Sequence, residues 1–187
     1  MKITFKSLWC ILAFCLPVLS AQAQVPAPNK PAKPLVFELK APGQPTLHVI
    51  HTNNGIKVKE YPGKVILLNF WGKHCRWCMK EIPHLVTLQK TYKGKLQIIA
   101  IQAQGRMTPG EKSRLFQRFG FNYPIYDYEE NPDFVRYISY RTDWQGGLPF
   151  SIIFDAAGNY VYKFTGYAPM EDLKRVIDFA IEHPGGK

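Results

Sequence analysis

Residues 65–78 read Val65-Ile66-Leu67-Leu68-Asn69-Phe70-Trp71-Gly72-Lys73-His74-Cys75-Arg76-Trp77-Cys78. The apolar first half predicts a central β-strand that is covered on both faces. We expect the two cysteines to open the following helix, where unpaired N–H groups and the helix dipole favour a thiolate. Because the thiolate is the attacking species in disulfide exchange, this Cys-x-x-Cys motif is a candidate redox centre.

A zinc site is the main alternative for the cysteine pair. Zinc needs four ligands, and His74 and His84 do not stand at a familiar ligand spacing. A helical offset of three instead places Cys75 and Cys78 on one face, where an exposed Cys75 can form a mixed disulfide and a more buried Cys78 can resolve it. We therefore expect no metal and no cofactor other than the redox-active disulfide Cys75–Cys78.

The N-terminal segment predicts export. Residues 1–23 combine a basic start, an apolar run and the small-x-small sequence Ala21-Gln22-Ala23, as in a cleaved secretory signal peptide. The apolar run is short for a membrane span, which needs about 20 residues, although an uncleaved signal acting as an anchor is the alternative. Residues 24–34 predict a proline-rich linker and residues 35–184 the folded domain. We expect a periplasmic location.

Cleavage of the signal peptide would leave Cys75 and Cys78 as a lone pair. In an oxidising compartment disulfides persist, and a structural disulfide would more usefully close a longer loop. This context favours working redox chemistry over a structural role.

The composition indicates a globular domain with a basic surface. The chain carries a formal net charge of +10, and 46% of its residues are apolar. The basic residues are scattered, without a run of five like charges, so a solvated basic surface is favoured and nucleic acid is not expected as a partner.

The pattern of apolar runs and breakers predicts alternating strands and helices. Strands are expected at 35–39, 47–50, 56–60, 65–70, 96–101, 123–126, 150–154 and 160–164. Helices are expected after Cys75 with a kink at Pro83, from Pro109 to Phe119 behind a Thr108–Glu111 capping box, from 132 to 138, and from about Pro169 to 183. This order predicts an α/β sandwich with a mixed central sheet.

Gly146-Gly147-Leu148-Pro149-Phe150 stands directly before one of these strands. Proline is tolerated at the first residue of a strand, and a cis peptide bond at Leu148–Pro149 fits this position.

The chain resembles the thioredoxin superfamily, and within it the exported TlpA/ResA/CcmG-like branch. The resemblance covers residues 35–182 and rests on Asn69-Phe70-Trp71, Cys75-Arg76-Trp77-Cys78, Glu81-Ile82-Pro83 and Leu148-Pro149-Phe150. It implies a thioredoxin-like three-layer sandwich with a mixed central sheet, an N-terminal strand extension and a central insertion. His74, where the family often has an aromatic residue, and the Arg76-Trp77 pair depart from the usual pattern.

The resemblance also implies roles for residues. Cys75 would attack, Cys78 would resolve, and Pro149 would be cis and face the pair across the substrate groove. Glu81 would tune the thiols or pass protons, although a first-turn carboxylate that interacts with the helix dipole is the structural alternative. For substrate binding we expect Trp71, His74, Trp77 and Leu148.

These expectations combine into a periplasmic thiol:disulfide oxidoreductase, acting as a monomer on disulfides of exported proteins. By resemblance the candidate client is apocytochrome c, and the electrons would come from a membrane thiol carrier of the CcdA/DsbD kind. Two alternatives remain: an oxidant that donates disulfides, favoured by the charges of His74 and Arg76, and a non-catalytic thioredoxin-fold binding module.

Overall fold

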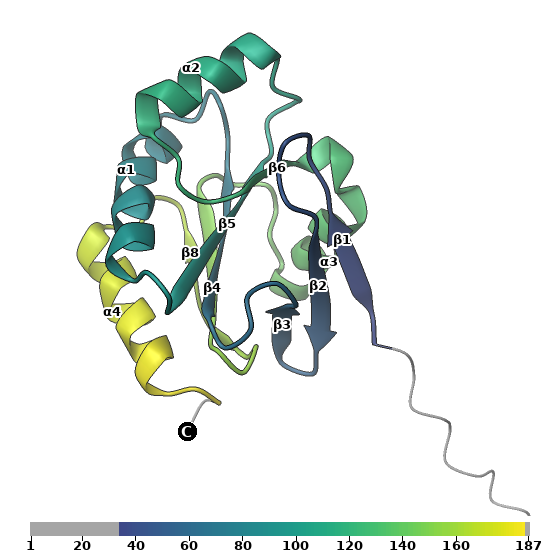
Figure 1. Ribbon diagram of the computed structural model, residues 1–187, viewed down its shortest axis with the longest axis vertical. Helices are drawn as coiled ribbons and strands as arrows, with labels where there is room; N and C mark the ends of the chain where they lie inside the picture. Colours follow the sequence, from purple (N-terminus) through teal and green to yellow (C-terminus); the bar gives the residue numbers. More distant parts are fainter. Residues whose placement is uncertain (1–33, 186–187) are drawn as a thin grey trace, which may run out of the picture. The chain divides into compact units, whose positions relative to one another are not determined.

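The computed structural model describes residues 34–185, which are built around a five-stranded mixed sheet (Figure 1). Across the sheet the strands are β6 (Ile125–Asp127), β5 (Leu96–Gln102), β4 (Val65–Trp71), β7 (Phe150–Phe154) and β8 (Tyr160–Thr165). The first three are parallel to one another, β7 is antiparallel to β4, and β8 is antiparallel to β7. The predicted mixed sheet is confirmed. The predicted signal peptide and all but the last residue of the predicted linker lie outside the described residues.

Three helices pack on the faces of this sheet: α1 (Arg76–Thr91), α4 (Met170–Glu182) and α3 (Pro132–Thr142). Side chains along β4 alternate between two cores. Val65 and Leu67 join the core formed with α1 and α4, whereas Ile66 and Leu68 join the core formed with α3. Every residue of β4 is buried, as its continuous apolar sequence predicts.

The N-terminal strands form a separate antiparallel sheet against the α3 side. Its order is β1 (Val36–Leu39), β2 (Leu47–Thr52) and β3 (Gly55–Val58). Because Thr52 pairs with Gly55, Asn53 and Asn54 connect β2 to β3 as a tight hairpin. The apolar side chains Leu39, Leu47 and Val49 of this sheet lie in the α3-side core.

The chain between β5 and β7 contains α2 (Pro109–Phe119), β6, a single 3₁₀ turn η1 (Tyr128–Glu130) and α3. The predicted capping box is present at the start of α2, where Thr108 and Glu111 exchange side-chain-to-backbone hydrogen bonds. None of the residues of α2 is fully buried; Leu115, Phe116 and Phe119 pack partly against the α1-side core. The helix therefore lies at the margin of the domain.

Several predicted boundaries differ from the structure by one to four residues. The helix α3 continues to Thr142 and ends at Asp143, which takes a left-handed backbone (φ 55°) and so closes the helix. The strand β6 begins at Ile125, two residues later than predicted. The helix α1 is continuous through Pro83.

Candidate active site

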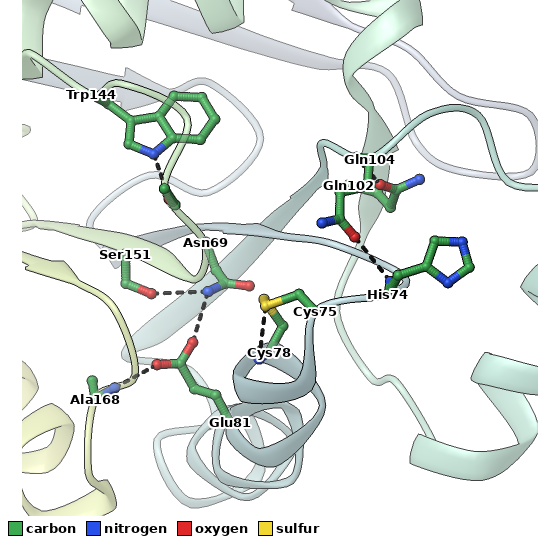
Figure 2. Close-up of a disulfide and its surroundings, with 11 residues drawn as sticks. Asn69, His74, Cys75, Cys78, Glu81, Gln102, Gln104, Trp144, Ser151 and Ala168 are labelled. Atoms are coloured by element: carbon green, nitrogen blue, oxygen red, sulfur yellow. Dashed lines mark hydrogen bonds between the residues drawn. A yellow bond between two sulfur atoms is a disulfide. The ribbon is translucent and has the colours of Figure 1, made fainter.

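The loop after β4 delivers Cys75 to the N-terminus of α1, as predicted. Cys75 is the N-cap residue, with an extended backbone, and its Sγ accepts a hydrogen bond from the backbone N–H of Cys78 at 3.2 Å. The two cysteines are joined by a disulfide (Figure 2). Cys75 is half-buried, whereas Cys78 is only 1% exposed. Solvent and an incoming thiol therefore reach Cys75, and the same N–H donor can stabilise its thiolate once the disulfide is reduced.

A buried carboxyl group lies one helical turn beyond Cys78. Glu81 is 1% exposed, and its Oε2 accepts a hydrogen bond from Asn69 Nδ2 at 3.1 Å while its Oε1 accepts one from the backbone N–H of Ala168 at 2.9 Å (Figure 2). Asn69 Nδ2 also donates to Ser151 Oγ at 2.9 Å. Burial raises the pKa of Glu81 to about 7, against the lowering effect of these two hydrogen bonds.

The Leu148–Pro149 peptide bond is cis. Phe150 pairs with Phe70 across β7 and β4, so the preceding Pro149 lies at the end of the sheet from which the chain enters the Cys75 loop. The carbonyl of Pro149 accepts a hydrogen bond from the Gly166 N–H at 2.9 Å. Pro149 is buried and Leu148 half-buried, so this segment brings both predicted residues to the disulfide end of the domain.

Trp144 supports the loop before the cis bond. Its ring stacks on Phe150 with a centroid separation of 5.6 Å. Its Nε1–H, which Figure 2 shows, donates to the Gly147 carbonyl at 2.7 Å. Gly146 takes a positive φ of 86°, which glycine adopts without the steric cost of a side chain. No local sequence pattern indicates this supporting role of Trp144.

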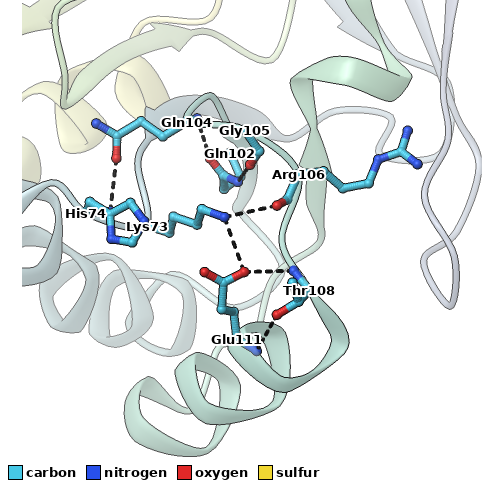
Figure 3. Close-up of polar contacts among 8 residues, drawn as sticks. All are labelled: Lys73, His74, Gln102, Gln104, Gly105, Arg106, Thr108 and Glu111. Carbon is cyan, nitrogen blue, oxygen red and sulfur yellow. Dashed lines mark hydrogen bonds and ion pairs between the residues drawn. The ribbon is translucent and has the colours of Figure 1, made fainter.

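The loop after β5 supports the other side of the Cys75 loop (Figure 3). The Gln104 side-chain oxygen accepts a hydrogen bond from the backbone N–H of His74 at 2.9 Å, and Gln102 bonds both to the Gln104 backbone N–H and to the Gly105 carbonyl. The side chain of His74 is exposed. Sequence reasoning missed both glutamines, because only the folded chain brings residues about thirty positions apart into contact.

The positive charge of Lys73, in the loop before Cys75, is paired with a carboxylate of α2. Lys73 Nζ lies 3.2 Å from Glu111 Oε2 and donates to the Arg106 carbonyl at 3.0 Å (Figure 3). Lys73 therefore adds no free positive charge around Cys75. Arg76 and Lys80, by contrast, are exposed.

The two predicted tryptophans have different surroundings. Trp77, between the cysteines, is 52% exposed. Its ring lies tilted against that of Tyr167 at a centroid distance of 5.8 Å, and the Lys80 ammonium lies over it. Trp71 is 1% exposed and packs against Phe121 in the α1-side core. Because Trp71, the last residue of β4, lies in the core and not at the surface, its position does not support the expected contact with substrate.

A family model described as Redoxin matches residues 40–177. The chain belongs to the Redoxin family. Its curated relatives include the thiol-disulfide oxidoreductase ResA of Geobacillus kaustophilus, 28% identical over 123 residues, and that of Bacillus thuringiensis, 30% identical over 120 residues. These matches cover 65% and 64% of this chain, and 66% and 65% of the two relatives, so they span just under two thirds of the relatives' length.

Solved structures agree on the fold of this Redoxin chain. A thioredoxin-family thiol:disulfide interchange protein from Chlorobium tepidum superposes with a TM-score of 0.57 at 22% identity, over 80% of this chain and 98% of that one. The predicted thioredoxin-like fold and the TlpA/ResA/CcmG-like branch are confirmed. The family, the ResA relatives and the disulfide in Cys-x-x-Cys spacing together support the prediction of a thiol:disulfide oxidoreductase.

The described part of this Redoxin chain shows neither a metal cluster nor a membrane span. Among residues 34–185, no group of three or more His, Cys, Asp or Glu side chains is placed to hold a metal ion. In the same range no helix is long and apolar enough to cross a bilayer. What the site does provide is one accessible sulfur, one buried sulfur and a buried carboxyl group that titrates near neutrality.

Proposed function

We propose that this protein is a periplasmic thiol:disulfide oxidoreductase that reduces disulfides in exported proteins. The observation that carries the proposal is the asymmetric pair: an accessible Cys75 at the N-terminus of α1, bonded to a buried Cys78 on the same helix face. The predicted signal peptide supports export. Apocytochrome c, whose haem-attachment cysteines must be reduced, is the proposed client.

The exchange proceeds in two balanced steps. The Cys75 thiolate attacks one sulfur of the client disulfide, which forms a mixed disulfide and releases the other client sulfur as a thiolate that takes up a proton. The Cys78 thiolate then attacks Cys75 Sγ, which re-forms the Cys75–Cys78 disulfide and releases the second client thiolate. Two electrons pass from the cysteine pair to the client, and an external dithiol of the CcdA/DsbD kind must restore them. No metal or organic cofactor is needed.

Glu81 is proposed to exchange the proton of Cys78. The two residues are three positions apart on α1, a spacing that places side chains on one helix face. A group with a pKa of about 7 holds and releases a proton with little bias at neutral pH, which suits a general acid–base role.

The substrate groove is proposed to lie between the Cys75 loop and the cis Leu148–Pro149 segment. Leu148 and Trp77 offer apolar contacts beside the disulfide, and His74 offers a polar one. These contacts suit an extended client chain that carries its cysteine into the groove.

The direct test is disulfide reduction by the purified chain with Cys75→Ser and Cys78→Ser variants. We expect wild-type protein to catalyse insulin reduction by dithiothreitol and both variants to lose turnover. Cys78→Ser should accumulate a mixed disulfide with insulin, and Cys75→Ser should not. Trapping on Cys78 instead of Cys75 would contradict the assigned roles.

The exposed basic residues His74 and Arg76 favour a second candidate function, an oxidant that donates disulfides. Positive charge beside Cys75 stabilises its thiolate and so favours the reduced protein. An oxidant would refold a reduced client faster than it reduces insulin.

A binding module, the third alternative, would bind its partner with no turnover and would retain that binding in Cys75→Ala.

A further inference from the structure

A groove of about 350 Å³ lies beside the disulfide, between the Cys75 loop and α2. Its lining is predominantly basic: Lys73, His74, Glu111, Arg114, Leu115 and Arg118. His74 precedes Cys75 directly in the chain, so the lining of the groove reaches to one residue before the attacking cysteine.

Two of the charges that line this groove neutralise each other. Lys73 and Glu111 form an ion pair at 3.2 Å, with side chains only 14% and 23% exposed. Hydrogen bonds from the Thr108 backbone N–H and from Lys73 lower the pKa of Glu111 to about 2. This carboxylate therefore stays ionised, and its charge is balanced by these neighbours. Glu111 is therefore not a free negative charge that would repel an anionic ligand.

The two arginines that line the groove have no ion-pair partner among the described residues. Arg114 and Arg118 are exposed, lie four residues apart on α2, and form no ion pair with any residue in the range 34–185. The Arg118 guanidinium lies 4.9 Å from the centre of the Phe119 ring, which restricts its freedom. The floor of the groove is thus neutral and its α2 wall is cationic.

We propose that this groove binds an acidic segment of the client polypeptide next to the disulfide that Cys75 attacks. The inference rests on the proposed function, because the polypeptide flanking a client cysteine is the ligand that comes close to the Cys75 loop during exchange. Carboxylates complement two unpaired guanidinium groups, and complementary charge raises the rate of encounter and fixes its register. The groove makes the enzyme selective for clients with acidic residues beside their cysteines.

The test uses three disulfide-bonded peptides of the same ring size that differ only in having acidic, neutral or basic flanking residues. The reduced protein transfers two electrons to each peptide in a single turnover, and acid-quenched samples give the rate of peptide thiol formation. We expect the acidic peptide to react about tenfold faster than the neutral one at low salt, with the advantage shrinking as salt increases. The double variant Arg114→Glu/Arg118→Glu should lose or invert this preference, and Arg114→Lys/Arg118→Lys should largely retain it.

The matched control is Lys93→Glu/Lys95→Glu. It changes the net charge by the same amount in the exposed turn before β5, at the opposite end of the sheet from Cys75. This variant should keep the acidic preference. Loss of the preference in this control would indicate a response to overall charge and would overturn the groove proposal.

A small neutral disulfide, 2-hydroxyethyl disulfide, separates this proposal from the proposed function. Wild type and all three double variants should reduce it at the same rate, because it does not fill the groove. No reaction with this compound would contradict the oxidoreductase itself.

Equal rates with all three peptides, or an acidic preference that survives in Arg114→Glu/Arg118→Glu, would overturn the proposal that the groove binds an acidic client segment. Weaker binding of that variant to anionic phospholipid vesicles, with its peptide preference unchanged, would overturn it in favour of a membrane surface.

Discussion

The side-chain amide of Asn69 donates a hydrogen bond to the Glu81 carboxylate 3.1 Å away, in the interior beside the Cys75–Cys78 disulfide (Figure 2). This bond joins β4, which leads into the Cys75 loop, to α1, which begins at that cysteine. Both groups are buried, so the strand and the helix that form the site are held together by a polar contact in an apolar core. The state of Glu81 should therefore affect both stability and exchange.

Glu81 should make the protein less stable as the pH rises towards neutrality. Its pKa of about 7 in the folded protein exceeds its ordinary value of 4.5, so the folded state binds the proton more tightly than the unfolded state. Its contribution to stability is full below pH 4.5 and is lost as the pH rises through 7, on the order of 3 kcal/mol. Glu81→Gln does not titrate, so urea unfolding from pH 4 to 8 should show a flatter profile for this variant. Parallel profiles would contradict the assignment.

Asn69→Ala should raise the pKa of Glu81 above 7. The substitution removes one of the two hydrogen bonds that lower this pKa, and it leaves a buried carboxyl oxygen unsatisfied at a cost of about 1–3 kcal/mol. Carbon-13 NMR of the Glu81 carboxyl gives the pKa directly. Ser151→Ala is the matched control, since it removes the other partner of Asn69 but leaves both hydrogen bonds of Glu81 in place. Equal pKa values in the two variants would contradict the network.

Gly72→Ala should slow exchange through Gln104. A Cβ at position 72 would lie 2.3 Å from Cδ and Oε1 of Gln104, the oxygen that holds the His74 N–H. Displacement of that side chain frees the Cys75 loop, and we expect insulin reduction to slow about tenfold. Gln104→Ala removes the obstruction, so Gly72→Ala/Gln104→Ala should be no slower than Gln104→Ala alone. Additive losses in the double variant would show that the two positions act separately.

Trp77→Ala should affect protein substrates more than small ones. Trp77 is 52% exposed, so its removal should change the free energy of unfolding by less than about 1 kcal/mol. The loss of an exposed aromatic contact beside the disulfide should raise the KM for insulin and leave the rate with 2-hydroxyethyl disulfide unchanged. A loss of rate with the small disulfide would assign Trp77 to the thiol chemistry instead of client binding.

Local sequence signals predicted most of this fold. The apolar runs of β4, β5 and β7 and the Thr108–Glu111 capping box each have a short-range physical cause, and all lie where they were expected. Boundaries that depend on the backbone of a single residue were not predictable in this way. Asp143 ends α3 in a left-handed conformation that its sequence context does not require.

The site was predictable only in part. Cys75 and Cys78 are recognisable because strand, loop and helix stand in sequence around them. The pairing of Lys73 with Glu111 and the hydrogen bond from His74 to Gln104 join residues 38 and 30 positions apart. Such contacts depend on the packing of α2 and of the loop after β5, which no local pattern specifies.

The reduction potential of the Cys75–Cys78 couple tests the central claim most directly. Equilibration of the purified chain with defined ratios of reduced and oxidised dithiothreitol, followed by thiol trapping, gives this value. A protein that reduces client disulfides should have a potential near that of thioredoxin, about −270 mV. A value near that of a strong oxidant, about −120 mV, would contradict the reductase and make the protein a disulfide donor.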